Sequence, residues 1–315
     1  MADGDDGVQQ VNRTTSGESP VDRMTDAAGS SHVPLAVGVF ATLGVALVFA
    51  SFMSSAFTSG GGGGLGLAAS VGFALAITPL LAVLTGTWAA RTDEEREGHT
   101  LSAAFGGVAG VFALYVAYYA VGSALGVGAG TVGIGPLFGW AVGVGVVAAL
   151  SALLVTSVDR STVDVDVGLS GDALVYSVGA FVALGIGLIV ALFAAGELAS
   201  SSSGAFAGFS ANTAASAPST LVTLAPVLGL LVGLVSASGE DGVARIGSAL
   251  VGAGVGFVLA YLVVFGLAHA LEPDAMDGIE LQYGAIVGVA VGVAIAGGLG
   301  SWVRHSNEIP ESGSP

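Results

Sequence analysis

The chain has 315 residues, of which 53% are hydrophobic and only 10% are charged. Soluble domains carry about 25% charged residues, so this composition and the mean hydropathy of +0.87 exclude an ordinary cytosolic enzyme. The apolar content also excludes intrinsic disorder over most of the chain. The class that remains is a polytopic membrane protein.

The charged residues are strongly biased towards acids. There are 23 Asp and Glu residues against seven arginines, lysine is absent, and the net charge is −16. Carboxylates hold hydrated cations well and high salt screens their mutual repulsion, so this bias points to a salt-rich interior. In composition the chain resembles uncharacterised multipass membrane proteins of halophilic archaea. The resemblance is one of composition and carries no named family.

Cysteine is absent, which excludes a disulfide, a zinc–thiolate site, an iron–sulfur cluster and a thiol nucleophile. Residues 1–32 are polar and acidic, and they lack a basic segment followed by a short apolar stretch with a cleavage site. We therefore expect no cleaved signal peptide, and a retained first span from Val33 onward. Residues 1–32 and 304–315 are expected to be disordered cytoplasmic tails.

Eight apolar segments are long enough to cross a bilayer as helices, which takes about 20 residues. They are much longer than the roughly ten-residue strands of a membrane β-barrel, so the predicted fold is an all-α transmembrane helix bundle. The predicted spans are Val33–Phe57, Leu65–Ala90, Thr100–Leu125, Ile134–Ser157, Ala173–Gly196, Thr220–Ser238, Ile246–Leu271 and Tyr283–Val303.

The polar segments that flank these spans alternate between two kinds. Starting from the N-terminal tail, every second segment contains arginine and the segments between them contain none. Cytoplasmic loops of membrane proteins are enriched in arginine and lysine, so the alternation predicts a multipass protein of the cell membrane with both termini in the cytoplasm. The arginines are Arg13, Arg23, Arg91, Arg96, Arg160, Arg245 and Arg304.

The second half of the chain resembles the first. Four successive spans match at offsets of 141, 147, 146 and 145 positions, and the matches pair Pro79 with Pro226 and Tyr115 with Tyr261. Duplication predicts a four-plus-four tandem repeat whose halves point the same way, because each half has an even number of spans. Low complexity is the alternative explanation, since chains of Gly, Ala, Val and Leu match one another easily. The predicted repeats are 33–157 and 173–303, joined by a cytoplasmic linker at 158–172.

Several predicted spans carry glycines four residues apart. This spacing puts the glycines on one helix face and lets two backbones approach closely, so we interpret them as helix-packing positions. Sliding or gating contacts are the alternative interpretation. The pairs are Gly106 with Gly110, Gly139 with Gly143, Gly252 with Gly256, and Gly284 with Gly288.

Ionisable residues deep in a membrane are the usual marks of ion and proton pathways, and the centres of these spans carry none. Glu197 and His269 lie at predicted external helix ends, and Glu272 follows His269 by three positions. We interpret all three as interfacial polar residues. Two such groups make a poor metal site, so we expect no metal.

Two prolines inside predicted spans mark the candidate cavity or hinge. Each proline removes a backbone donor and frees a carbonyl, which kinks a helix. Thr78 precedes Pro79 and is placed to bond the freed carbonyl. Pro226 has a similar position in the second half, and Tyr115 and Tyr261 offer neutral hydroxyls. A passive kink with packing aromatics is the alternative interpretation of these five residues.

No catalytic constellation, phosphate-binding loop or basic groove occurs in the sequence, so we expect no enzyme activity, no cofactor and no nucleic-acid partner. Two functions remain open. The first is a non-catalytic structural or accessory component whose partner is the lipid bilayer. The second is a secondary transporter or channel for a neutral or weakly amphipathic solute, with its site between the two repeats. The sequence does not decide oligomeric state.

Overall fold

The computed structural model is helical throughout the part that it describes, and no strand occurs there. The predicted tails at 1–32 and 304–315 and the linker at 158–172 lie outside that part, apart from their edges. The described residues are 32–57, 71–92, 98–125, 132–158, 171–199, 214–236, 242–277, 279, 281 and 283–308.

Eight long helices and two short ones make up this described part. The short helices are η1, Ala214–Ser216, and α9, Pro273–Met276. The long helices are α2 His32–Phe57, α3 Val71–Thr92, α4 Gly98–Ala124, α5 Ile134–Val158, α6 Gly171–Ala199, α7 Ala217–Ser236, α8 Gly242–Leu271 and α10 Tyr283–Glu308.

Seven of the long helices are long and apolar enough to cross a membrane. The exception is α3, whose apolar stretch Ala74–Ala90 is shorter. The predicted second span, Leu65–Ala90, is therefore represented only by this helix, and its first six residues lie outside the described ranges. Apolar residues occupy every side of these helices instead of a single stripe, which is typical of helices surrounded by lipid and by other helices.

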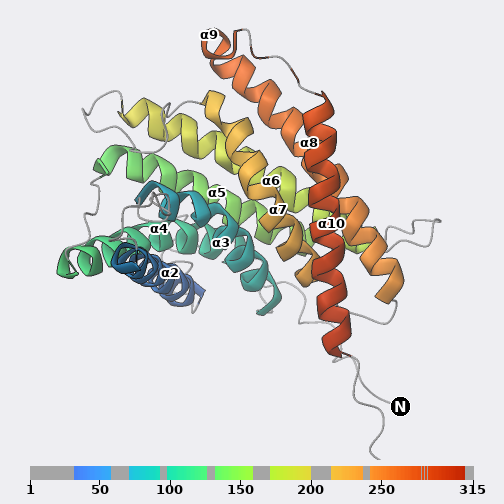
Figure 1. The fold of residues 1–315 in the computed structure, drawn as a ribbon, viewed down its shortest axis with the longest axis horizontal. Coiled ribbons are helices and arrows are strands. Elements are labelled where there is room, and N and C mark those ends of the chain that lie inside the picture. The colour runs from blue at the N-terminus through green and yellow to red at the C-terminus, as the bar shows by residue number, and fades with distance from the viewer. Residues whose placement is uncertain are drawn as a thin grey trace, which may run out of the picture.

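The helices form one elongated bundle in which α2 lies at one end and α10 at the other (Figure 1). In the first half, α4 packs against α2, α3 and α5, and α5 also packs against α3. In the second half, α8 packs against α6, α7 and α10, and α10 also packs against α7. The halves meet mainly where α5 packs against α6, with smaller contacts from α3 to α6 and α7.

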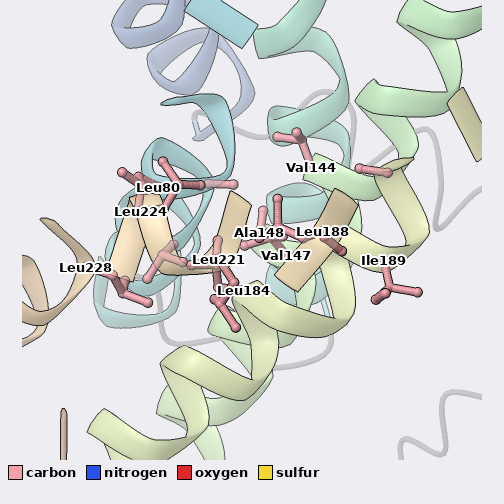
Figure 2. Close-up of a cluster of buried hydrophobic side chains, with 14 of the residues drawn as sticks. Leu80, Val144, Val147, Ala148, Leu184, Leu188, Ile189, Leu221, Leu224 and Leu228 are labelled. Atoms are coloured by element: carbon pink, nitrogen blue, oxygen red, sulfur yellow. The ribbon is translucent and has the colours of Figure 1, made fainter. Parts of the chain in front are cut away.

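A buried aliphatic cluster fills the region where the halves meet (Figure 2). Its side chains come from α3 and α5 in the first half and from α6 and α7 in the second. The most buried of them, such as Leu184 and Leu188, have no exposed surface. The labelled members are Leu80, Val144, Val147, Ala148, Leu184, Leu188, Ile189, Leu221, Leu224 and Leu228.

Candidate functional site

Pro79 lies inside α3, and the carbonyl that it frees is bonded by two side chains. A proline at this position removes the N–H that would bond the carbonyl of Leu75, four residues earlier. The Thr78 hydroxyl donates to the Leu75 oxygen at 2.6 Å, as its place before the proline predicts. The indole N–H of Trp140 on α5 donates to the same oxygen at 3.2 Å and to Thr78 Oγ1 at 2.9 Å. The carbonyl that Pro79 frees is thus bonded by side chains of the first half.

Trp140 is the residue of this site that the sequence analysis missed. Its side chain is only 1% exposed, and a buried indole N–H needs an acceptor. The sequence did contain both groups of this contact, a tryptophan in one predicted span and a carbonyl freed by a proline in another. Their pairing could not be predicted, because Trp140 and Thr78 are 62 positions apart in the chain.

Pro226 does not mirror the Pro79 site. It lies inside α7 but is exposed on the surface of the bundle, whereas Pro79 is buried. The position that matches Trp140 in the second half, 145 residues later, is Ala285, which has no N–H side chain to offer. The two prolines therefore do not form a matched pair around a central axis.

The two tyrosines of the predicted cavity also lie apart from the meeting of the halves. The Tyr115 hydroxyl accepts from the N–H of Val132 at 3.3 Å and lies 3.4 Å from its carbonyl oxygen, so it anchors the residues before α5. Tyr261 is half-buried between two aromatic rings of its own helix, with ring-centre distances of 5.9 Å to Phe257 and 6.2 Å to Phe265. Both tyrosines act in packing.

None of the five predicted cavity residues lines either of two grooves in the described part of the chain. The first, of about 350 Å³, is lined by residues of α2 and α3, including Leu35, Val39 and Trp88, and by Val235 of α7. The second, of about 430 Å³, lies between α8 and α10 and includes Val255 and Val291. Both grooves are lined almost wholly by apolar side chains.

Glu272 has a structural partner that the sequence did not indicate. Its two carboxylate oxygens accept hydrogen bonds from the backbone N–H groups of Ala214 at 3.0 Å and Ala215 at 3.2 Å. These N–H groups begin the η1–α7 segment, where a helix leaves its first donors without partners. Glu272 thus ties the end of α8 to the start of α7. His269 and Glu197 are both exposed at helix ends.

Six of the eight predicted packing glycines lie directly against another helix. A Cβ atom added to Gly139 would lie 2.5 Å from the carbonyl carbon of Ala194 on α6, and one added to Gly143 would overlap Ala191. Gly106 and Gly110 pack against α2, and Gly252 and Gly256 pack against α6.

Gly284 and Gly288 correct the packing prediction. Nothing lies within 4 Å of a Cβ atom added to either of them, and both are exposed on α10. The reason is position: α10 lies at one end of the bundle, and no described residue packs against this face at Gly284 and Gly288 (Figure 1). Glycine spacing alone predicts a close approach but not which helix makes it.

Comparisons of this chain with protein-family models, with curated proteins and with solved structures find no significant match.

Proposed function

We propose that the chain is an integral membrane protein of eight spans. The helix α3 has 22 residues, which at 1.5 Å per residue makes it about 33 Å long, close to the roughly 30 Å thickness of the hydrocarbon core. The three residues before its apolar stretch, Val71, Gly72 and Phe73, carry no polar side chain, so the whole helix from Val71 to Ala90 is available for the span. An even span count also agrees with arginine on one side only, so both termini are cytoplasmic in the cell membrane.

The eight spans arose, in this proposal, by duplication of a four-helix unit. The supporting observation is that matched positions make matched contacts. A Cβ atom added to Gly106 would lie 3.1 Å from Cβ of Ala36. One added to Gly252 would lie 2.7 Å from Cβ of Ser177, and these two residues match the first two at offsets of 146 and 141. Low complexity accounts for similar residues in the two halves, but it does not account for contacts between the same pairs of positions.

A second set of contacts repeats in the same way. Gly44 approaches the carbonyl oxygen of Leu114, and Gly185, 141 positions after Gly44, approaches Ala260, 146 positions after Leu114. For α3 and α7 the contacts favour an offset of 143 instead of 147. Gly86 on α3 packs against Ala148, and Gly229 on α7 packs against Val293, the match of Ala148. With this offset the two prolines are no longer equivalent.

The function that the geometry supports best is a non-catalytic structural or accessory component of the membrane. The observation that carries this proposal is the closed interface between the halves, where α5 and α6 approach at the glycine positions and aliphatic side chains fill the remaining space. A carrier or channel needs polar groups or water at such a place. An enzyme needs a positioned polar pair, whereas Thr78, Tyr115 and Glu272 each bond backbone groups.

The alternative proposal, a transporter or channel for a neutral solute, needs a water-filled path between the halves. Its basis was a cavity lined by Thr78, Pro79, Tyr115, Pro226 and Tyr261. The separation of these residues removes that basis, and the transport hypothesis would need another path.

Thiol labelling distinguishes the two proposals, because the chain has no cysteine of its own. Leu188→Cys on α6 and Leu224→Cys on α7 place single thiols in the cluster between the halves. We expect neither to react with a membrane-impermeant thiol reagent from either side of the membrane until detergent unfolds the protein. Ser202→Cys, in a predicted external loop, is the positive control. Reaction of either buried thiol in the folded protein would favour the transport hypothesis.

A further inference from the structure

The two helices at the ends of the bundle, α10 and α2, match the two helices of its central contact, α5 and α6. Each end helix has a face that no described helix covers. In the centre of the bundle, the face of α5 that contains Gly139, Gly143 and Val147 is covered by α6. The matching positions on α10, 145 residues later, are glycines whose added Cβ atoms would meet nothing within 4 Å, and all three are exposed. They are Gly284, Gly288 and Gly292.

Side chains beside this stripe show the same change. Leu154 on α5 packs its methyl groups against Gly179 of α6. Its match on α10, Leu299, is 51% exposed. This face of α10 thus matches the face of α5 that α6 covers, but no described helix covers it. Exposed glycines in a membrane span leave a shallow groove that lipid chains fill less well than a second helix does.

The helix that would complement α10 is also present in the chain, at the other end. The match of α6 is α2, and the match of Gly179 is Gly38. A Cβ atom added to Gly38 would meet nothing within 4 Å, whereas Gly179 is in contact with α5. At Gly38, the described face of α2 therefore matches the α6 face that α5 covers, but no described residue covers it.

The burial of larger side chains supports this reading of α2. Leu35 and Val39 are 40% and 39% exposed and line the groove between α2 and α3. Their matches on α6, Tyr176 and Ala180, are only 6% and 1% exposed. The α2 side of this groove thus corresponds to a face of α6 that is buried.

From these observations we infer that a second copy of the chain binds end to end, with α10 of one copy packed against α2 of the next in the manner of α5 against α6. The inference rests on the duplication proposed above. The helices α2 and α10 lie at opposite ends of the bundle, so one chain cannot join them itself (Figure 1).

The orientation of the helices in the membrane fits this contact. With eight spans, α5 and α6 run in opposite directions across the bilayer because they are consecutive. The first span, α2, and the last span, α10, also run in opposite directions. When two copies are inserted in the membrane the same way, α10 of one copy and α2 of the next are therefore antiparallel, as α5 and α6 are. A head-to-tail contact of this kind uses two different faces, and it repeats until it closes into a ring or extends as a filament.

Disulfide trapping in the cysteine-free chain tests the contact. A Cβ atom added to Gly187 would lie 3.2 Å from Cβ of Val147, within reach of a disulfide. The positions that match this pair are Ala46 on α2 and Gly292 on α10. Two differently tagged chains, one with Ala46→Cys and one with Gly292→Cys, are co-expressed and oxidised in the native membrane. We expect a disulfide-linked dimer that carries both tags.

Two controls make each outcome decisive. Val147→Cys with Gly187→Cys in one chain reports the contact within the bundle. Gly266→Cys replaces Gly292→Cys as the matched control, because Gly266 is also exposed with nothing within 4 Å but lies on α8. No dimer from the test pair while the internal pair closes would overturn the inference and leave the fold intact. Failure of the internal pair would instead overturn the arrangement of the halves on which the proposed function depends.

A dimer formed by Gly292→Cys alone would mean that two α10 helices face each other, which also overturns the inference. A steric variant gives an independent readout. Gly288→Leu fills the stripe at an exposed position where an added Cβ atom meets no described atom within 4 Å, so we expect a folded protein in which the two-tag dimer is lost. Gly266→Leu should leave the dimer unchanged. An unchanged dimer in Gly288→Leu would contradict the proposed contact.

Discussion

The closed contact between α5 and α6 makes a quantitative prediction for Gly139→Ala. The added methyl carbon would lie 2.5 Å from the carbonyl carbon of Ala194 and 2.6 Å from the backbone nitrogen of Ala195. Carbon atoms in contact normally lie about 3.5–4.0 Å apart, so the overlap is about 1 Å. The overlapping atoms belong to the backbone of α6 and cannot turn away. The two helices must therefore separate by a similar distance.

This separation has a cost that exceeds the gain from alanine. Overpacking of a tight interior costs about 1–3 kcal/mol, and a radial gap of about 0.5–1 Å forfeits a quarter to a half of each dispersion contact. Replacing glycine by alanine within a helix returns up to about 1 kcal/mol. We expect Gly139→Ala to lower the free energy of unfolding by about 1–2 kcal/mol. Gly266→Ala, which meets no atom within 4 Å, should raise it by up to about 1 kcal/mol.

The assay is equilibrium unfolding in mixed micelles with increasing denaturing detergent, followed by helical circular dichroism. The two variants differ from the original chain by the same methyl group, so opposite signs of the change in unfolding free energy isolate the effect of the contact. Equal effects of Gly139→Ala and Gly266→Ala would refute the reasoning that α5 and α6 are in backbone contact.

Further predictions concern polar contacts, packing and salt. Trp140→Phe removes the indole donor from the Leu75 carbonyl and should cost about 1–2 kcal/mol in the same unfolding assay. Glu272→Ala should speed hydrogen exchange of the two backbone amides at the start of the η1–α7 segment, because their acceptor is lost. Gly252→Leu should lower thermal stability more than Glu197→Gln does, since only the first lies against another helix. Dilution from about 1 M to about 0.1 M salt lengthens the Debye length from about 3 to about 10 Å, so a chain with a net charge of −16 should lose thermal stability on dilution.

Hydropathy was sufficient to locate the helices, because a run of about 20 apolar residues has few other structures open to it in a membrane. The predicted span Ile134–Ser157 and the helix α5, Ile134–Val158, differ by one residue. The helix α10 begins at the predicted Tyr283 but extends beyond Val303 to Glu308, since a helix continues past the apolar run that predicts it. The bond from Thr78 to the freed carbonyl was also predictable, because both groups lie within one turn of the same helix.

The sequence could not predict contacts between residues that are distant in the chain. Glu272 bonds backbone groups 58 and 57 positions away, and nothing in its local sequence indicates them. The glycine pairs show the same limit of prediction from the sequence more clearly. Gly143 and Gly288 have the same spacing and the same neighbours in sequence, yet one packs against α6 and the other meets nothing within 4 Å. Which face is covered depends on where a helix lies in the bundle.

The central claim, a bundle of eight spans, is tested most directly by the side of the membrane on which each terminus lies. Tags at the two termini of the full chain are digested by a protease added to sealed vesicles of known orientation. Eight spans place both tags on the cytoplasmic side, where the protease removes both or neither, depending on the orientation of the vesicles. If α3 did not cross, seven spans would place the tags on opposite sides, and the protease would remove only one of them.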